Sequence, residues 1–327
     1  MQLRTLFDGG PAEEYCQQAI LTDLAGARLS SAFRAYYRVR PLLPIAVRQR
    51  LQQRRNQRMP QSDDWFLPTE FLRGLSRLLP KGSKVEIWPD AHRFALVLTH
   101  DVETAEGLRR VPAIADMEEG LGLRSCWNLV PYKYAIDQGL VRDLQQRGFE
   151  IGVHGYNHDG RLFWSEKEFR RRAPMIAAAA RQLGAVGFRA PMVHRNLDWI
   201  QRLPFEYDAS CFDVDPYQAM PGGVGQLWPF FAGEMVELPY TLPQDHTLFV
   251  TLGETSDRVW RQKLGHIEEW SGMALLLTHP DYLDTPALLE VYRGFLEYAS
   301  NRSGVWHALP REAACLLRER AQRECVA

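Results

Sequence analysis

The stretch FALVLTHDVE, residues 94–103, joins a strand signal to a group of ionisable side chains. Its first part, FALVLT, is a continuous apolar run of strand length, which is typical of a strand buried on both faces. His100, Asp101 and Glu103 follow immediately. We therefore predict a buried parallel strand that brings these side chains to its carboxyl end.

The order of strand, loop and helix is repeated along the chain after this stretch. Further strands are predicted over 123–130, 149–154, 186–191 and 273–279, with shorter candidates at 207–210 and 235–238. Helices are predicted over 104–119, 137–147, 166–183, 197–203, 257–270 and 286–301. This alternation implies parallel strands joined by helical crossovers, which is an α/β fold.

Residues 1–90 lack the alternation and are predicted to form an Arg-rich helical extension that packs on a larger domain, residues 91–327. Within the extension, apolar and aromatic residues interleave with arginines over 33–57. This pattern is compatible with a helix in peripheral contact with an anionic membrane, and also with RNA binding. We favour a helix whose apolar stripe packs against the larger domain.

The composition argues against several classes of protein. The 327 residues are 46% hydrophobic, which is too apolar for a disordered chain. Lys and Arg number 39 against 40 Asp and Glu, and the net charge of −1 disfavours a nucleic-acid partner. The five cysteines include no C-x-x-C pair, which disfavours a disulfide framework or a cysteine zinc site. Neither a signal-peptide pattern nor an apolar run of ~18 residues is present, so we expect a cytoplasmic protein.

Polar side chains also lie at the ends of three other predicted strands. They are His154, His158, Arg189 and His279. In a parallel barrel the carboxyl ends of the strands lie on one face, where the catalytic loops converge. We therefore expect these side chains to meet Asp101 and Glu103 in one site.

The segment HGYNH, residues 154–158, places two imidazoles four residues apart. Side chains at this spacing share one face of a helical turn and can bind one ion. Alone, the pattern is as typical of two surface histidines. Together with a nearby carboxylate, it makes a ligand set that leaves positions open for water and substrate, as in a catalytic zinc, cobalt or nickel site.

Four segments resemble, in order and spacing, the successive motifs of the polysaccharide deacetylases, the NodB-homology proteins of carbohydrate esterase family 4. They are LTHDVE at 98–103, HGYNH at 154–158, GFRAP at 187–191 and LLTHP at 276–280. The resemblance covers about residues 94–280. It implies a distorted (β/α) barrel of about seven parallel strands.

The resemblance also implies a role for each site residue. Three match catalytic side chains, namely Asp101 as the base, Arg189 as the residue that holds the base, and His279 as the acid. Three match ligands of a divalent metal, namely Glu103, His154 and His158. The family carries aspartate where this chain has Glu103, and the extra methylene moves the carboxylate by more than an ångström. Glu103 therefore binds the metal directly or through a water molecule, or Asp101 is the carboxylate that binds the metal instead.

The implied activity is that of a metal-dependent hydrolase that removes an N-acyl group, most often acetyl, from an amino sugar in a glycan or glycan intermediate. One alternative is hydrolysis of another linear or cyclic C–N amide bond on the same fold. The other is a catalytically silent domain that binds a glycan. The oligomeric state is not predicted.

Several other residues near the motifs receive a weaker interpretation. The loop ELPYTLPQDH, residues 237–246, resembles a late loop of the same family, with Gln244 and Asp245 facing the substrate. His100 is interpreted as structural. His194 and His246 match no motif and are interpreted as residues outside the site.

Overall fold

The sheet is built around strand β2 (Phe94–Val102), all nine residues of which are buried. In the computed structural model, β2 pairs in parallel with β9 (Met273–Thr278) along one edge. Its other edge pairs first with β10 (Val305–Ala308) and then with β3 (Cys126–Leu129), again in parallel. The structure describes residues 1–324 except 8, 29, 40–46, 48–53, 55–63, 65 and 81–84.

Seven parallel strands follow one another in the order β9, β2, β3, β4 (Glu150–His154), β5 (Gly187–Arg189), β6 (Tyr207–Asp208) and β8 (Met235–Glu237). Beyond β8, the sheet continues into antiparallel β7 (Phe230–Ala232) and β1 (Leu3–Arg4). After β8, Leu242 forms a parallel bridge to Leu276 of β9, so the sheet curls back towards its first strand. The predicted distorted (β/α) barrel is confirmed, with β10, β7 and β1 added to the predicted strands.

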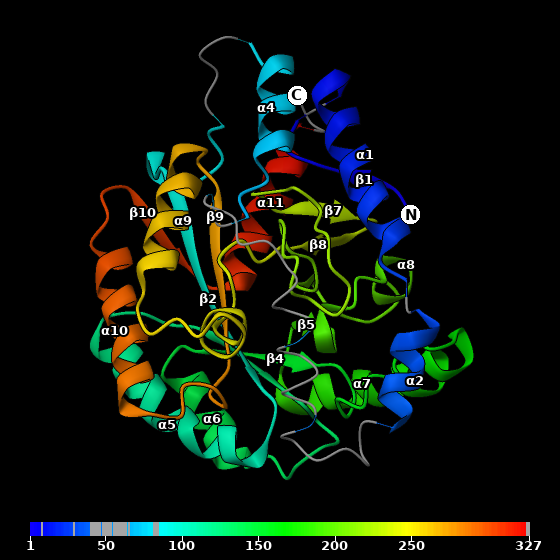
Figure 1. The fold of residues 1–327 in the computed structure, drawn as a ribbon, viewed down its shortest axis with the longest axis vertical. Helices are drawn as coiled ribbons and strands as arrows, with labels where there is room; N and C mark the ends of the chain where they lie inside the picture. Colours follow the sequence, from blue (N-terminus) through cyan, green and yellow to red (C-terminus); the bar gives the residue numbers. More distant parts are fainter. Residues whose placement is uncertain are drawn as a thin grey trace.

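Helices cover the outside of the curled sheet (Figure 1). After β2 come α5 (Ala105–Gly120), α6 (Gln138–Gln146), α7 (Glu166–Leu183), α8 (Leu197–Ile200), α9 (Arg258–Glu269), α10 (Pro286–Ser300) and α11 (Pro310–Glu324). Short 3₁₀ helices span Pro89–Ala91 and Pro191–Val193, and a π-helix spans His246–Leu252. Side chains of Thr104, Ser165 and Thr285 accept hydrogen bonds at the first turns of α5, α7 and α10, which explains where these helices begin.

The N-terminal residues pack on the barrel. Helix α1 (Gly10–Gly26) lies beside α4 (Thr69–Leu78), and Figure 1 shows this pair together at the edge of the molecule. Helix α2 (Ser31–Val39) is also described, and Arg38 on it lies over the ring of Trp164. The domain boundary predicted after residue 90 stays a prediction. The stretch proposed for membrane contact, 33–57, lies largely outside the described residues.

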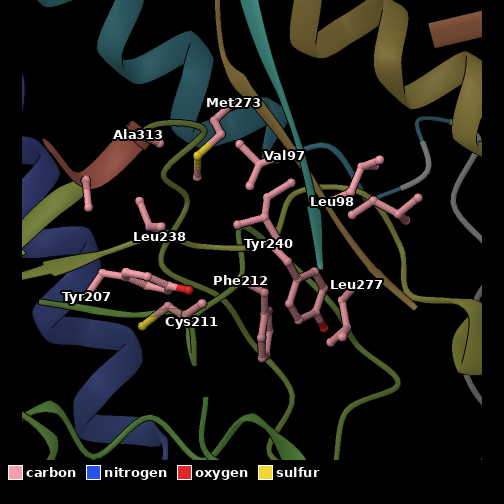
Figure 2. Packing of buried hydrophobic residues seen from close by; sticks show 14 of the residues in the cluster. Val97, Leu98, Tyr207, Cys211, Phe212, Leu238, Tyr240, Met273, Leu277 and Ala313 are labelled. Atoms are coloured by element: carbon pink, nitrogen blue, oxygen red, sulfur yellow. The ribbon is translucent and has the colours of Figure 1, made fainter. Parts of the chain in front are cut away.

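The inside of the curled sheet is filled by side chains. Figure 2 shows Phe212 and Tyr240 side by side, with ring centroids 5.2 Å apart, below Val97 and Met273. The barrel is therefore a packed core rather than a channel, as is usual for this architecture. Within the described residues, no helix combines the length and apolarity needed to cross a membrane.

A buried ion pair ties the N-terminal segment to the barrel. Asp23 of α1 accepts two bonds from Arg195, at 2.6 Å from Nε and 3.1 Å from Nη2, and both side chains are almost fully buried. Asp23 Oδ1 also accepts a 2.8 Å bond from the backbone N–H of Gly223. Removing one member of such a pair leaves an uncompensated buried charge.

We therefore expect Asp23→Ala to lower the free energy of unfolding by about 3–5 kcal/mol. Glu14→Ala is the matched control, because Glu14 lies on the same helix and is exposed; it should change stability by less than about 0.5 kcal/mol. Denaturant unfolding of the three proteins measures both values. Equal stability of Asp23→Ala and Glu14→Ala would contradict a stabilising role for the pair of Asp23 and Arg195.

Candidate functional site

The carboxyl ends of β2, β4, β5 and β9 bring the predicted side chains into one cluster. Asp101 lies 3.1 Å from Arg189 and 3.6 Å from His154. Glu103 lies 3.0 Å from His158 and 3.9 Å from His279. The sequence prediction that these side chains converge therefore agrees with the structure, while their chemical roles remain to be proposed.

Asp101 is held in place by its Oδ1 atom. That oxygen accepts bonds from Arg189 Nη1 at 3.1 Å and from Asn128 Nδ2 at 2.9 Å, while Oδ2 lies 3.6 Å from His154 Nδ1. Burial would raise the pKa of the carboxyl, but His154, Arg189 and His279 outweigh it and lower the pKa of Asp101. Asp101 is therefore an ionised acceptor with one oxygen committed to bonds.

Arg189 is fully buried and fixed by three bonds. Nε donates to the backbone oxygen of Ala209 at 2.7 Å, and Nη1 donates to Thr99 Oγ1 at 2.9 Å as well as to Asp101. Because its partners lie on β2 and just beyond β6, the guanidinium has little freedom to turn. Its position fixes the orientation of the Asp101 carboxylate.

Glu103, His154 and His158 form a group that could hold a metal ion, since one ligand atom of each lies within 4.8 Å of the others. His154 Nδ1 lies 3.1 Å from the backbone oxygen of Arg189, so Nδ1 carries the hydrogen and Nε2 keeps a free lone pair. Nε2 is buried and bonds no part of the protein that the structure describes. Burial lowers the pKa of His154 to about 4, which keeps the ring neutral, as metal binding requires.

His158 completes this group from an unusual backbone conformation, with φ at 57°. Its Nε2 atom approaches Glu103 Oε1 to 3.0 Å, but without the geometry of a hydrogen bond. Two imidazole nitrogens and one carboxylate oxygen that face each other in this way suit zinc or a similar divalent ion. The residues present therefore fit a metal centre.

The backbone of Glu103 is held by Asp281, to which the sequence analysis gave no role. Asp281 Oδ2 accepts a 3.0 Å bond from the Glu103 N–H, and Oδ1 accepts a bond from Thr104 Oγ1. The carboxylate fits there because residue 107, in the first turn of α5, is glycine; a Cβ at Gly107 would overlap it. Its position gave a signal in the sequence, since Asp281 lies two residues after His279, just beyond the end of β9.

His279 is paired with Asp245. Asp245 Oδ1 lies 2.7 Å from His279 Nδ1, and Oδ2 accepts a 2.6 Å bond from the His279 N–H. Burial would lower the pKa of the imidazole, but Asp245, Glu103 and Asp101 outweigh it and raise the pKa of His279 to about 9. We expected Asp245 to face the substrate. In the structure both of its carboxylate oxygens instead contact His279.

His100 lies on the opposite side of β2 from Asp101, as strand alternation requires. Its Nε2 atom lies 2.7 Å from Glu118 Oε1, and its Nδ1 atom lies 2.8 Å from Thr278 Oγ1. The ring stacks on Trp127 with centroids 4.0 Å apart. These contacts hold β2, β9 and α5 together and are consistent with the structural interpretation of His100.

We expect Gly107→Ala to displace the Asp281 carboxylate and to cost about 1–3 kcal/mol of stability, because buried bonds to Glu103 and Thr104 are lost. Gly120→Ala is the control on the same helix, since a Cβ there meets nothing within 4 Å. It should be neutral or slightly stabilising. Thermal and denaturant unfolding compare the two variants, and equal effects would contradict the proposed tight fit of Asp281.

Comparison with known proteins adds a likeness of fold. No protein-family profile and no curated protein sequence matches the chain. Among solved structures, a Mycobacterium smegmatis protein assigned to the polysaccharide deacetylases aligns with a TM-score of 0.59 and 19% identity, over 74% of this chain and 96% of that chain. PuuE allantoinase aligns with a TM-score of 0.56 and 16% identity, over 72% of this chain and 94% of that chain. A Pseudomonas aeruginosa PAO1 protein, also assigned to the polysaccharide deacetylases, aligns with a TM-score of 0.55 and 16% identity, over 73% of this chain and 95% of that chain. The chain therefore has the fold of the polysaccharide deacetylases, which PuuE allantoinase shares.

Proposed function

We propose that this protein is a metal-dependent hydrolase that removes an N-acyl group, acetyl by preference, from an amino sugar in a glycan or glycan intermediate. One observation carries the proposal. The Glu103, His154 and His158 group lies beside two buried acid–base pairs, Asp101 with Arg189 and His279 with Asp245. The likeness of fold to polysaccharide deacetylases supports the same activity.

The proposed metal is zinc, with cobalt or nickel as substitutes, since all three accept imidazole and carboxylate ligands. Glu103, His154 and His158 would hold it. A divalent ion bound there would polarise the amide carbonyl and lower the pKa of a water molecule. The chain's own part is to orient the imidazoles, which the Arg189 backbone oxygen does for His154.

Asp101 is the proposed general base. Its Oδ1 atom is occupied by Arg189 and Asn128, so Oδ2 is the oxygen available to accept a proton from the attacking water. Arg189 keeps the carboxylate ionised and in place during this transfer. The oxygen of the water then forms the new bond to the acyl carbon.

His279 is the proposed general acid. Asp245 holds Nδ1, so the proton on Nε2 is the one that faces the cluster. As the C–N bond breaks, Nε2 gives this proton to the departing amine, and the acyl group leaves as a carboxylic acid, which then loses its proton to water. The proton taken by Asp101 and the proton given by His279 balance over the reaction.

Acetate release from N-acetylglucosamine oligomers tests the function. The zinc-loaded protein should release acetate, and Asp101→Asn should lower kcat by ~10²–10⁴ while keeping the fold. Allantoin belongs in the same assay, because PuuE allantoinase shares the fold. Cleavage of allantoin alone would favour the alternative C–N hydrolase, and no cleavage with zinc, cobalt or nickel would favour the silent glycan-binding domain.

We expect His154→Ala and His158→Ala each to abolish binding of one zinc ion per chain, because each removes one of three ligands. His266→Ala is the matched control, since His266 is partly exposed and lies outside the group. Glu103→Gln should weaken zinc binding because a neutral amide attracts a dication less strongly. Metal analysis and calorimetric titration measure these effects. One tightly bound zinc in the His154→Ala, His158→Ala double variant would place the metal elsewhere.

We expect kcat to fall as the pH rises through about 9, because His279 must carry its proton and its pKa is raised to about 9. Asp245→Asn removes the carboxylate that raises this pKa, so the alkaline limb should move to lower pH by a unit or more. Asp284→Asn, an exposed control, should leave the limb in place. Profiles of kcat against pH for the three proteins measure the shift, and an unmoved limb in Asp245→Asn would contradict the role of His279.

A further inference from the structure

A chain of polar side chains runs from Asp101 into the interior of the barrel, and beyond Asn128 it is used by none of the steps above. Asn128 Nδ2 donates to Asp101 Oδ1 at 2.9 Å, and Asn128 Oδ1 accepts a bond from Cys126 Sγ at 3.6 Å. Tyr207 Oη lies 3.4 Å from Cys126 Sγ and donates to Glu150 Oε1 at 2.5 Å. None of these five residues is more than 2% exposed.

Two strand glycines make room for the chain. In the sheet, Gly152 is the partner of Asn128, and Gly187 is the partner of Tyr207. A Cβ at Gly152 would overlap Asn128 Oδ1, and a Cβ at Gly187 would overlap the Tyr207 ring. Because Gly187 has no side chain, Tyr207 of β6 can cross over β5 and reach Glu150 on β4. The strands are therefore shaped to accommodate these polar side chains.

The direction of the hydrogen bonds follows from the charge on Asp101. An ionised carboxylate only accepts, so the Asn128 amide must turn Nδ2 towards Asp101 and Oδ1 towards Cys126. The reversed amide would set its oxygen against the carboxylate. Burial raises the pKa of Cys126 well above its usual range, so the thiol keeps the hydrogen that it donates to Asn128 Oδ1. The thiol therefore favours the amide orientation that Asp101 needs.

Tyr207 holds the Cys126 thiol from the other side, with its Oη atom 3.4 Å from Sγ. The Tyr207 hydroxyl is held in turn by Glu150. Glu150 Oε2 accepts a 3.1 Å bond from the backbone N–H of Arg311, in the first turn of α11. Since each of these groups is bonded on both sides, the chain links the orientation of the Asn128 amide to the start of α11.

We propose that Cys126 and Tyr207 are positioning residues of the reaction, which fix the Asn128 amide and, through it, the Asp101 carboxylate. This inference rests on the proposed function, since that function makes Asp101 the base. One bond from Arg189 to Oδ1 would still let the carboxylate turn, and the second bond, from Asn128, restricts this motion. Oδ2 then stays directed at the attacking water, and small errors in such an alignment lower the rate steeply.

Turnover of N-acetylglucosamine oligomers by the zinc-loaded protein tests the inference. Cys126→Ala removes the donor and should lower kcat about 5–10-fold, the scale of one neutral hydrogen bond, with KM within about twofold of the wild type. Cys126→Ser keeps a donor in a side chain of nearly the same size as alanine, so kcat should return to within about threefold of the wild type. Equal losses in the two variants would indicate packing alone.

Cys211→Ala is the matched control, because Cys211 is equally buried in the same interior (Figure 2) and lies outside the chain of side chains. It should turn over as the wild type does. A loss in Cys211→Ala equal to that in Cys126→Ala would show that any cavity in this core lowers the rate, and would overturn the inference.

Coupling to Asn128 separates positioning from a general effect on the core. Tyr207→Phe keeps the ring but removes the hydroxyl, and should lower kcat about 2–5-fold. In an Asn128→Ala background, Cys126→Ala and Tyr207→Phe should each change kcat by less than about twofold, because the amide through which they act is gone. Equal effects in the two backgrounds would contradict the positioning role.

Crystal structures of Cys126→Ala and Cys126→Ser give a readout that does not depend on activity. The Asn128 amide should leave Asp101 or adopt two orientations in the first variant, and keep its bond to Asp101 in the second. A reoriented amide without acetate release by the wild type would contradict the deacetylase function and support the positioning role. Acetate release with a fixed amide, or with an unchanged kcat, in Cys126→Ala would do the reverse. If Cys126→Ala fails to fold, Tyr207→Phe provides both readouts.

Discussion

The ion pair between Asp101 and Arg189 is the constraint on which the rest of the site depends. It joins β2 to β5 across two intervening strands, at 3.1 Å and almost entirely out of water. Burying two charges costs several kcal/mol per ion unless hydrogen bonds compensate. Asn128, Thr99 and the Ala209 backbone oxygen provide them. The geometry of this side-chain cluster and the closure of the barrel are therefore parts of one packing arrangement.

Burial and neighbouring cations act against each other on the buried acids of this interior. Burial raises the pKa of Glu150 to about 7, where a Tyr207 hydroxyl is its close side-chain partner. Asp208 and Glu237 pair in register on β6 and β8, and burial, with each carboxyl beside the other, raises both of their pKa values. At the carboxyl ends of the strands, imidazoles and Arg189 reverse the effect and lower the pKa of Asp101, and imidazoles do the same for Glu103. His100 reverses it in the same way for Glu118. Burial thus favours the neutral form of Asp208 and Glu237, whereas Asp101 and Glu103 in the site are held ionised.

The sequence predicted the parts of this molecule that have a local pattern. The buried strand 94–102 begins with the apolar run FALVLT, and the site residues Asp101 and Glu103 come shortly after that run. Strand β10 escaped prediction because three of its four residues are only partly buried, and β1 is two residues long. Asn128 and Asp281 escaped because their importance lies in contacts 27 and 178 residues away, which no local pattern records.

The same contacts bear on the choice that the sequence left open between Glu103 and Asp101 as the third metal ligand. Asp101 has Oδ1 committed to Arg189 and Asn128, and its Oδ2 faces His154 Nδ1, the nitrogen that already carries a hydrogen. Glu103 instead reaches His158 Nε2, while Asp281 anchors its backbone N–H. The extra methylene lets the carboxylate span from this anchored position to the imidazoles. We infer that Glu103 is the ligand, and that this leaves Asp101 free to act as the base.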